Sequence, residues 1–228
     1  MKYIVVGLGS FGASLAEKLT EQGNEVIAID TSMNKVEHYK ERISHTICMD
    51  ATDEFTVSGL PLRETDMVVV AIGEDKGANV MATALFKNLK AKRLVSRAID
   101  ELHEKVLHAI GVDEVVHPEE ESAERWAKKL CLKGVVDSFE LNDDYSIVEV
   151  GVPAKLQGKT IKESNIREGY NLLVLTTIAN TEEKSTLGNT ISVTKVKGVA
   201  NPNSILSKDD LIVIYGANKD IKRFIKDD

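Results

Sequence analysis

Three glycines, Gly7, Gly9 and Gly12, follow a short apolar run near the start of the chain in the spacing Gly-x-Gly-x-x-Gly. The first glycine permits a tight turn, the second lets the backbone approach a phosphate, and the third lets the following helix pack closely on a sheet. The start of that helix would offer unpaired N–H groups and a partial positive charge to an anion. The stretch therefore predicts a phosphate-binding turn that also includes Ser10 and Phe11.

A carboxylate stands where a nucleotide-binding turn of this kind requires one. A second apolar run ends at Asp30, and a carboxylate there can accept hydrogen bonds from both ribose hydroxyls of an adenosine. No arginine stands beside Thr31 and Ser32 to pair a 2′-phosphate, so we expect a free ribose and not NADP. The alternative is that the glycines only make a tight turn and that Asp30 caps the next helix.

Two further loops should line the same pocket, because ligands of open α/β sheets lie outside the carboxyl ends of the strands. The residues of these loops are Asp50, Ala51, Thr52, Ala71, Ile72 and Gly73. Asp50 and Thr52 could instead cap a short helix that begins near Asp53. The pocket suits NAD, ADP or ATP, and the glycine turn alone does not indicate which of these ligands is bound.

Catalytic partners for such a pocket are absent from the sequence pattern. A dehydrogenase needs a proton-transfer group beside the hydride, but His103 and His108 are expected to be surface residues of one helix. Tyr215 and Lys219 match a Tyr-x-x-x-Lys acid/base pair, yet they follow the last strand, far from the glycine turn. No Gly-x-Ser-x-Gly and no Walker lysine occurs. We therefore expect the pocket to bind its ligand without chemistry.

The elements that must position these residues alternate along residues 1–134. Six β-branched runs are separated by helical patterns at 11–22, 32–41, 54–58, 79–89, 101–110 and 119–132. Strands connected by helices predict a parallel sheet covered on both faces, which is a doubly wound, Rossmann-like α/β fold. From 135 to 228 near-alternating runs predict a second, smaller α+β domain, with an extended polar hairpin near 180–198.

Composition limits the class of protein. The chain has 228 residues, 43% of them hydrophobic, and a net charge of −7, as in a soluble globular protein of two domains. The negative charge argues against a nucleic-acid partner, because phosphate backbones require clustered Lys and Arg. The longest apolar run is far shorter than the roughly 20 residues of a membrane helix. Cys48 and Cys131 lack disulfide spacing, so we expect buried, reduced thiols in a cytoplasmic protein.

The helix expected at 119–132 carries two further features. An apolar stripe at i, i+3, i+4 and i+7 should pack inside the same subunit. It consists of Ala123, Trp126, Ala127 and Leu130. At the start of the helix, Glu119 follows Pro118, and acidic residues are favoured there by the helix dipole. The alternative is that Glu119 faces the nucleotide phosphates through a divalent cation.

Several stretches carry a family pattern. They are GLGSFG, VIAID, DATDE, VVVAIG and KVLHAIGVDEVVHPEEESAERWA in the first domain, and YSIVEV, PAKLQGKTIKESNIR and DDLIVIYGANKDIKRF in the second. Together they resemble the cytosolic Trk/Ktr potassium-uptake regulators over nearly the whole chain. The resemblance implies an N-terminal RCK nucleotide-binding domain at 1–134 and an RCK_C domain at 135–228.

The resemblance also implies function and partners. Members of this family are not enzymes, and their homodimers assemble into rings, typically octamers. In the family a helix at the place of 119–132 crosses to the neighbouring subunit, so the alternative for Trp126 is that it packs at a dimer interface. The rings lie on the cytoplasmic face of a separate potassium-translocating membrane subunit, bind ATP, ADP or NAD(H), and gate transport. Two rival functions stay open beside this one. They are an NAD-dependent oxidoreductase with a small substrate domain and a stand-alone nucleotide sensor.

By position, the resemblance carries family roles onto single residues. The glycine turn, Asp30 and the two flanking loops match the nucleotide site, Arg97 its basic residue after the fifth strand, and Glu119 its acidic position linked to Mg or Ca. One departure is Ser10, because many members have there an arginine that helps to hold the γ-phosphate. Serine supplies no charge, and charged hydrogen bonds are about twice as strong. ADP, AMP and NAD therefore stay open beside ATP.

Some relatives also bind cyclic di-AMP in the second domain. The positions that match are Ile161, Asn165, Ile166 and Arg167. The alternative is that this segment only forms a short helix whose two isoleucines lie in the core.

Overall fold

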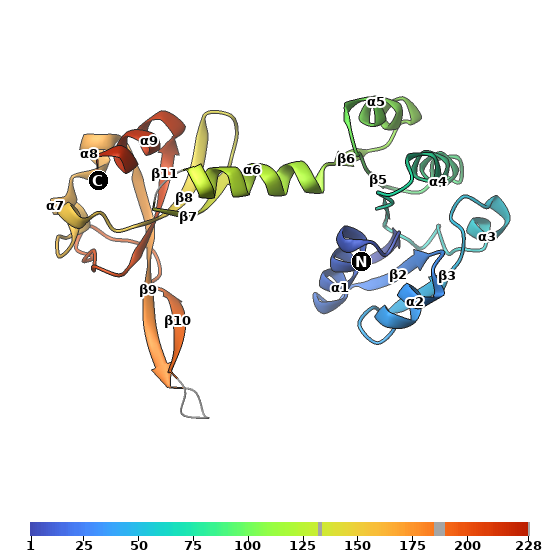
Figure 1. Ribbon diagram of the computed structural model, residues 1–228, viewed down its shortest axis with the longest axis horizontal. Coiled ribbons are helices and arrows are strands. Elements are labelled where there is room, and N and C mark those ends of the chain that lie inside the picture. Colours follow the sequence, from blue (N-terminus) through green and yellow to red (C-terminus); the bar gives the residue numbers. More distant parts are fainter. Residues whose placement is uncertain (132–133, 185–189, 228) are drawn as a thin grey trace. The chain divides into compact units, whose positions relative to one another are not determined.

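The computed structural model describes residues 1–131, 134–184 and 190–227. The chain divides into two compact units, Met1–Glu120 and Glu121–Asp228 (Figure 1). Each unit has its own sheet and its own hydrophobic core. The helix α6 (Pro118–Cys131) carries the chain from the first unit into the second.

The first unit is built on a parallel sheet of six strands, as predicted. Its order is β3-β2-β1-β4-β5-β6, so the strand order reverses between β1 and β4. The strands are β1 (Lys2–Val6), β2 (Glu25–Asp30), β3 (His45–Cys48), β4 (Met67–Val70), β5 (Leu94–Arg97) and β6 (Glu114–Val116). All neighbours in this sheet run parallel. This confirms the doubly wound, Rossmann-like fold.

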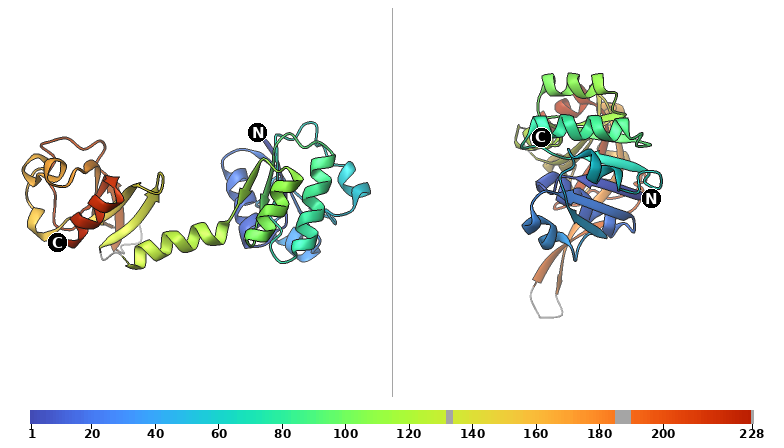
Figure 2. Two further views of the ribbon diagram at one scale, coloured as in Figure 1. Left: turned by 90° about the horizontal axis from the view of Figure 1, so that it is seen from above. Right: turned by 90° about the vertical axis from the view of Figure 1, so that its right-hand side faces the viewer.

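Helices cover both faces of this sheet, as the two further views in Figure 2 also show. The helices are α1 (Ser10–Glu21), α2 (Met33–Tyr39), α3 (Glu54–Ser58), α4 (Lys76–Asn88) and α5 (Glu101–Ile110). Strand β1 alternates between the faces. Val5 packs with α1 and α2, while Ile4 and Val6 pack with α3 and α4. Because every central strand is buried on both sides, the apolar runs are nearly continuous.

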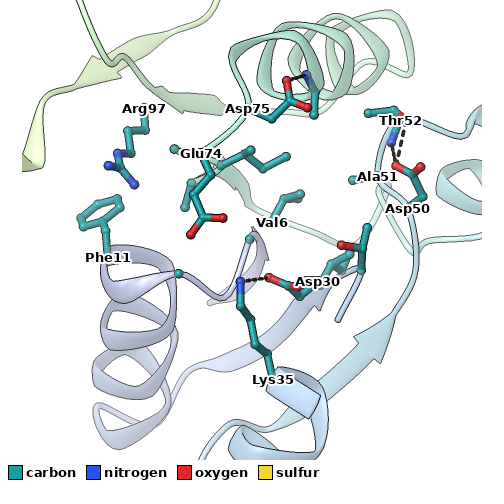
Figure 3. Close-up of a pocket in the computed structure, with 18 of the residues that line it drawn as sticks. Val6, Phe11, Asp30, Lys35, Asp50, Ala51, Thr52, Glu74, Asp75 and Arg97 are labelled. Atoms are coloured by element: carbon teal, nitrogen blue, oxygen red, sulfur yellow. Dashed lines mark hydrogen bonds and ion pairs between the residues drawn. The ribbon is translucent and has the colours of Figure 1, made fainter. Parts of the chain in front are cut away.

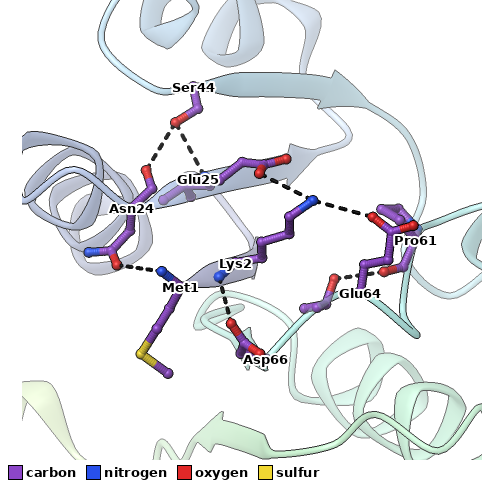
Figure 4. A network of polar contacts seen from close by, with 10 residues as sticks. Met1, Lys2, Asn24, Glu25, Ser44, Pro61, Glu64 and Asp66 are labelled. Atoms are coloured by element: carbon purple, nitrogen blue, oxygen red, sulfur yellow. Dashed lines mark hydrogen bonds and ion pairs between the residues drawn. The ribbon is translucent and has the colours of Figure 1, made fainter.

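Polar contacts tie together the amino ends of the strands in the first unit (Figure 4). The backbone N–H of Lys2 donates to Asp66 at 2.9 Å, and its ammonium group lies 3.3 Å from both Glu25 and Glu64. The Ser44 hydroxyl joins the start of β2 to the loop before β3. These contacts close the edge of the sheet opposite to the carboxyl ends of the strands.

The second unit contains an antiparallel sheet in the order β10-β9-β11-β8-β7 and short helices that follow α6, which confirms a smaller α+β domain. The strands are β7 (Val135–Glu140), β8 (Tyr145–Gly151), β9 (Leu173–Lys184), β10 (Thr190–Val196) and β11 (Leu211–Ala217), and the helices are α7 (Ile161–Ser164), α8 (Ile166–Tyr170) and α9 (Asn218–Lys226). Strands β9 and β10 form the extended hairpin, whose residues 185–189 lie outside the described residues. Residue 132, the expected end of the preceding long helix, lies outside them too.

Three expectations about burial are wrong. Cys48 and Cys131 are both exposed, because Cys48 ends the edge strand β3 and Cys131 ends α6. His103 is buried on the inner face of α5, whereas His108 is exposed. The apolar stripe of α6 is also exposed, with Trp126 at 57%.

None of the helices in the described part of the chain is long and apolar enough to cross a membrane.

Candidate functional site

A pocket with a volume of about 570 Å³ lies in the first unit, at the carboxyl ends of the strands where the strand order reverses (Figure 3). It brings together most of the residues that the sequence singled out. These are Gly7, Gly9, Ser10, Phe11, Asp30, Thr31, Asp50, Ala51, Thr52, Ala71, Ile72, Gly73, Arg97 and Glu119. Gly12 and Ser32 are not part of its lining. The lining residues that sequence reasoning missed are Val6, Ile29, Lys35, Met49, Glu74, Asp75, Ala78 and Met81.

Each glycine of the glycine turn has a different structural role. Gly7 has φ +98°, a left-handed conformation, and its N–H donates to the Ile29 carbonyl at 2.7 Å. A Cβ on Gly12 would lie 2.0 Å from the Gly7 carbonyl oxygen, so α1 packs directly on the turn. A Cβ on Gly9 would meet no atom within 4 Å. Gly9 therefore leaves open the part of the pocket in front of α1.

Helix α1 begins without a side-chain cap. Its N-cap is Gly9, and no acidic residue stands in its first turn. By contrast, aspartates cap α3, α4 and α5 by accepting backbone N–H bonds; they are Asp53, Asp75 and Asp100. The first N–H groups of α1, at Ser10 and Phe11, have no intrahelical acceptor, and both residues line the pocket. Such a helix start attracts an anion.

Asp30 is held rigidly at the end of β2. One carboxylate oxygen accepts the N–H of Leu8 at 2.7 Å, and the other accepts the N–H of Ser32 at 2.8 Å. The ammonium group of Lys35, in the first turn of α2, lies 3.4 Å away (Figure 3). Asp30 thus bonds the backbone just before α2 but does not cap this helix, whose N-cap is Ser32 without a side-chain cap, and it also fixes the glycine turn. The Asp30 side chain is only 8% exposed, so its position is set before any ligand arrives.

Asp50 and Thr52, in the loop after β3, do not cap α3, because Asp53 at the end of this loop does so. Asp50 instead accepts the N–H of Thr52 at 2.9 Å and its hydroxyl at 2.8 Å. These hydrogen bonds to Thr52 hold the pKa of the Asp50 carboxyl below its usual value. The alternative that Asp50 and Thr52 cap this helix is therefore wrong.

Asn79 holds in place the part of the pocket that is formed by the ends of β4 and β5. Its side chain is fully buried and donates to the carbonyls of Ile72 at 2.8 Å and Arg97 at 3.1 Å. Its own oxygen accepts from the Ser96 hydroxyl at 3.1 Å. Asn79 therefore joins the ends of β4 and β5. The sequence signal that could have identified Asn79 is a polar residue among the apolar positions of the expected helix.

Arg97 places a largely buried charge in the pocket. Its guanidinium group lies against Gly73, where a Cβ would stand 2.1 Å from Nη1. Its Nη2 donates to Oε1 of Glu119 at 2.5 Å, while no described residue accepts from the buried Nε. A glycine cradle and a donor without an acceptor fit the binding of a further anion.

Acidic groups outnumber basic ones in the pocket. The acidic lining residues are Asp30, Asp50, Glu74, Asp75 and Glu119, and the basic ones are Lys35 and Arg97. Each basic group already has a carboxylate partner. A ligand with several unscreened negative charges would therefore meet repulsion from the pocket walls. The described residues contain no group of three or more His, Cys, Asp or Glu that could hold a metal ion.

The four positions matched to cyclic di-AMP lie around the turn between α7 and α8. Ile166 is 1% exposed in the core of the second unit, and Ile161 packs against that core. Asn165 has φ +52° at the helix junction, and Asn165 and Arg167 are exposed. The two isoleucines thus have the core role of the alternative, and the ligand stays a prediction. Tyr215 and Lys219 also belong to this unit, on β11 and α9.

The sheet order, the glycine turn and the pocket at the reversal point define a Rossmann-type protein with a pocket at the carboxyl edge of its sheet. A family model described as the TrkA-N domain matches residues 3–118. Ktr system potassium uptake protein C of Bacillus subtilis (strain 168) is 34% identical over 228 residues, covering 99% of this chain and 96% of that protein. This chain belongs to the TrkA-N domain family, among the Ktr system potassium uptake proteins.

Two solved structures have a similar fold. The GsuK RCK domain has a TM-score of 0.63 at 17% identity, covering 99% of this chain and 46% of that chain. The GsuK channel bound to NAD has a TM-score of 0.61 at 17% identity, covering 96% of this chain and 37% of that chain. The chain thus spans less than half the length of either structure. At this identity the likeness bears on the fold alone.

Proposed function

We propose that the pocket of the first unit binds an adenine nucleotide and that the chain is the nucleotide-sensing, regulatory subunit of a Ktr-type potassium uptake system. One observation carries the proposal. The uncapped start of α1 and the fixed carboxylate of Asp30 line a single pocket, and the Leu8 N–H holds them together at 2.7 Å. A phosphate and a ribose need these two partners. The NAD bound in the GsuK channel supports the same class of ligand.

Each part of the nucleotide has partners of suitable chemistry. The ribose hydroxyls would donate to Asp30, and apolar lining residues such as Ile29, Met49 and Ile72 would contact the adenine. The phosphates would accept from the N–H groups of Ser10 and Phe11. The excess of acidic lining groups favours NAD(H), AMP or ADP over free ATP. A Mg or Ca ion that joins Glu119 to the phosphates would reduce the difference in affinity between these ligands and ATP.

The lining supports sensing rather than catalysis. Among the described residues it contains no His, Tyr or Cys, and its one lysine, Lys35, is paired with Asp30. A hydride transfer would lack the usual proton donor beside the nicotinamide. Regulation would follow from tighter binding to one conformation of the assembly than to another. This favours the regulator over an oxidoreductase.

We also propose the assembly that such a role requires. The chain would form homodimers that assemble into a ring, with eight subunits as the expected number, on the cytoplasmic face of a separate potassium-translocating membrane subunit. Residues 1–134 would form the RCK domain and residues 135–228 the RCK_C domain. The 34% identity to a Ktr system protein over the whole chain supports this partner. Cyclic di-AMP would be a second ligand at the α7–α8 turn.

Potassium flux into vesicles that contain the membrane subunit tests the proposal. Flux should change when ADP, ATP or NADH is added with this chain present, and should not respond to nucleotide without it. If potassium flux did not depend on nucleotide, the result would favour the alternative that the chain is a stand-alone nucleotide sensor. Oxidation of NADH by a panel of carbonyl compounds, catalysed by this chain, would contradict the regulatory role.

A further inference from the structure

A lysine lies beside the carboxylate to which the ribose is expected to bind. The ammonium group of Lys35 is 3.4 Å from Oδ2 of Asp30, and both residues line the pocket (Figure 3). The other basic lining residue, Arg97, lies instead against Gly73 at the end of β4 and β5. Lys35 is therefore placed to contact the sugar of a bound nucleotide, while Arg97 is not.

Lys35 occupies a helical position that does not favour a cation. It is the third residue of α2, whose N-cap, Ser32, makes no side-chain hydrogen bond to the helix. A glutamate at the third position would complete a capping box with a serine N-cap and would suit the partial positive charge of the helix start. The first turn of α2 contains no acidic residue. A residue that breaks a local preference beside a pocket points to a role in that pocket.

The contact with Lys35 is the most adaptable of those that Asp30 makes. Oδ2 accepts the N–H of Leu8 at 2.7 Å, and Oδ1 accepts the N–H of Ser32 at 2.8 Å, whereas the ammonium group is at 3.4 Å. The Asp30 side chain is 8% exposed and the Lys35 side chain 41%. The lysine can therefore shift while the backbone bonds keep the carboxylate in place.

A ribose hydroxyl can satisfy both charged groups at once. A hydroxyl has one donor and two lone pairs, a carboxylate only accepts, and an ammonium group only donates. The hydroxyl would donate to Asp30 and accept from Lys35. A ligand that covers Asp30 also removes water from its charge, so the carboxylate needs a nearby cation in the complex. Lys35 would thus remain beside Asp30 after the ligand binds.

We propose that Lys35 selects ribonucleotides by donating a hydrogen bond to the ribose hydroxyl that donates to Asp30. The inference rests on the proposed nucleotide binding and adds the residue that distinguishes a ribose from a deoxyribose. The two side chains together require a group that is both donor and acceptor. A 2′-phosphate has no proton to donate to Asp30 at neutral pH, and the carboxylate repels its charge. The same pair therefore disfavours NADPH.

The test combines a change in the protein with a change in the ligand. The wild type, Lys35→Met and the control Lys40→Met are each titrated by calorimetry with ADP, 2′-deoxy-ADP and 3′-deoxy-ADP. Lys40 is the C-cap of the same helix, pairs with Glu37 at 2.9 Å and is not part of the pocket lining. The control thus removes the same charge from a nearby position outside the pocket.

The expected result is a loss that depends on the hydroxyl. Lys35→Met should weaken ADP binding by about tenfold, as for one hydrogen bond to a charged group. With the analogue that lacks the contacted hydroxyl, the loss should be about fivefold smaller. Lys40→Met should bind all three ligands as the wild type does. Wild-type affinity of Lys35→Met for ADP would overturn the inference. So would an equal loss with ADP and with both analogues, because Lys35 would then act through its charge alone.

A comparison of NADH with NADPH separates a hydroxyl partner of Lys35 from a phosphate partner. The wild type should bind NADH more tightly than NADPH. Equal or tighter binding of NADPH would assign Lys35 to a 2′-phosphate and would also overturn the inference. If the wild type bound none of these nucleotides, the result would instead contradict the proposed function.

Discussion

The open space at Gly9 allows the ligand site to be blocked without disturbing the fold. Gly9 has φ −75° and ψ −177°, which any residue adopts, and a Cβ there meets no atom within 4 Å. In Gly9→Val the new methyl groups would occupy the space in front of the N–H groups of Ser10 and Phe11. Because valine is a poorer N-cap than glycine, we expect a loss of stability of about 1 kcal/mol or less.

The expected loss of affinity follows from the contacts that the valine would exclude. A hydrogen bond to a charged phosphate contributes about 1.5–3 kcal/mol. Loss of one such bond would weaken binding by about 10-fold to 100-fold, since about 1.4 kcal/mol corresponds to a factor of ten. The assay is calorimetric titration with ADP, combined with urea unfolding to verify the fold.

Gly151→Val is the matched control for this substitution. A Cβ at Gly151 also meets no atom within 4 Å, and this glycine lies on β8 of the second unit. The control should bind ADP like the wild type. If folded Gly9→Val bound ADP with wild-type affinity, the phosphates could not lie at the start of α1, and the reasoning would be refuted.

Three further predictions concern stability and accessibility. Gly12→Ala should lower the free energy of unfolding by about 1–3 kcal/mol in urea, because its Cβ would overlap the Gly7 carbonyl; wild-type stability would contradict this packing. His103 is buried, its ring nitrogens have no partner among the described residues, and burial lowers its pKa. The unfolded chain therefore binds the extra proton, so stability should fall as the pH drops below about 6.5, by at most about 1.4 kcal/mol per pH unit. In urea titrations at pH 7.5 and 5.5, His103→Phe should lose less stability between the two pH values than the wild type does. An equal loss of stability in both proteins would show that other groups cause the pH dependence. Finally, the Cys48 thiol lies 3.4 Å from the carbonyl of Thr31, a pocket residue, so ADP should slow alkylation of Cys48 and not of exposed Cys131; equal protection of both would contradict the location of the ligand.

The sequence predicts the first unit well because its signals are local. The glycine spacing, the apolar runs and the aspartate at the end of the second run all lie within 30 residues. They therefore determine the strand, turn, helix and strand that build half of the pocket. The loops at 50–52 and 71–73 follow from the rule that parallel strands present their carboxyl ends at one edge.

The missed residues depend on how neighbouring elements fold against one another, which neither residue type nor spacing reveals. Asn79 joins the ends of β4 and β5, and Lys35 approaches Asp30 only because α2 folds back on the sheet. The burial of His103 depends on which face of α5 meets the sheet. The spacing of histidines does not reveal this. The stripe with Trp126 shows a related limit, because periodicity identifies an apolar face but not whether its own subunit covers it.

Calorimetric titration of the wild-type protein with AMP, ADP, NADH and ATP, each with and without Mg²⁺, tests the central claim most directly. The account predicts one adenine nucleotide per chain, recovered chemically unchanged, with ATP gaining more from Mg²⁺ than NADH does because the lining is acidic. If none of these nucleotides bound, or if the bound nucleotide were converted, the pocket could not have the sensing role proposed for it.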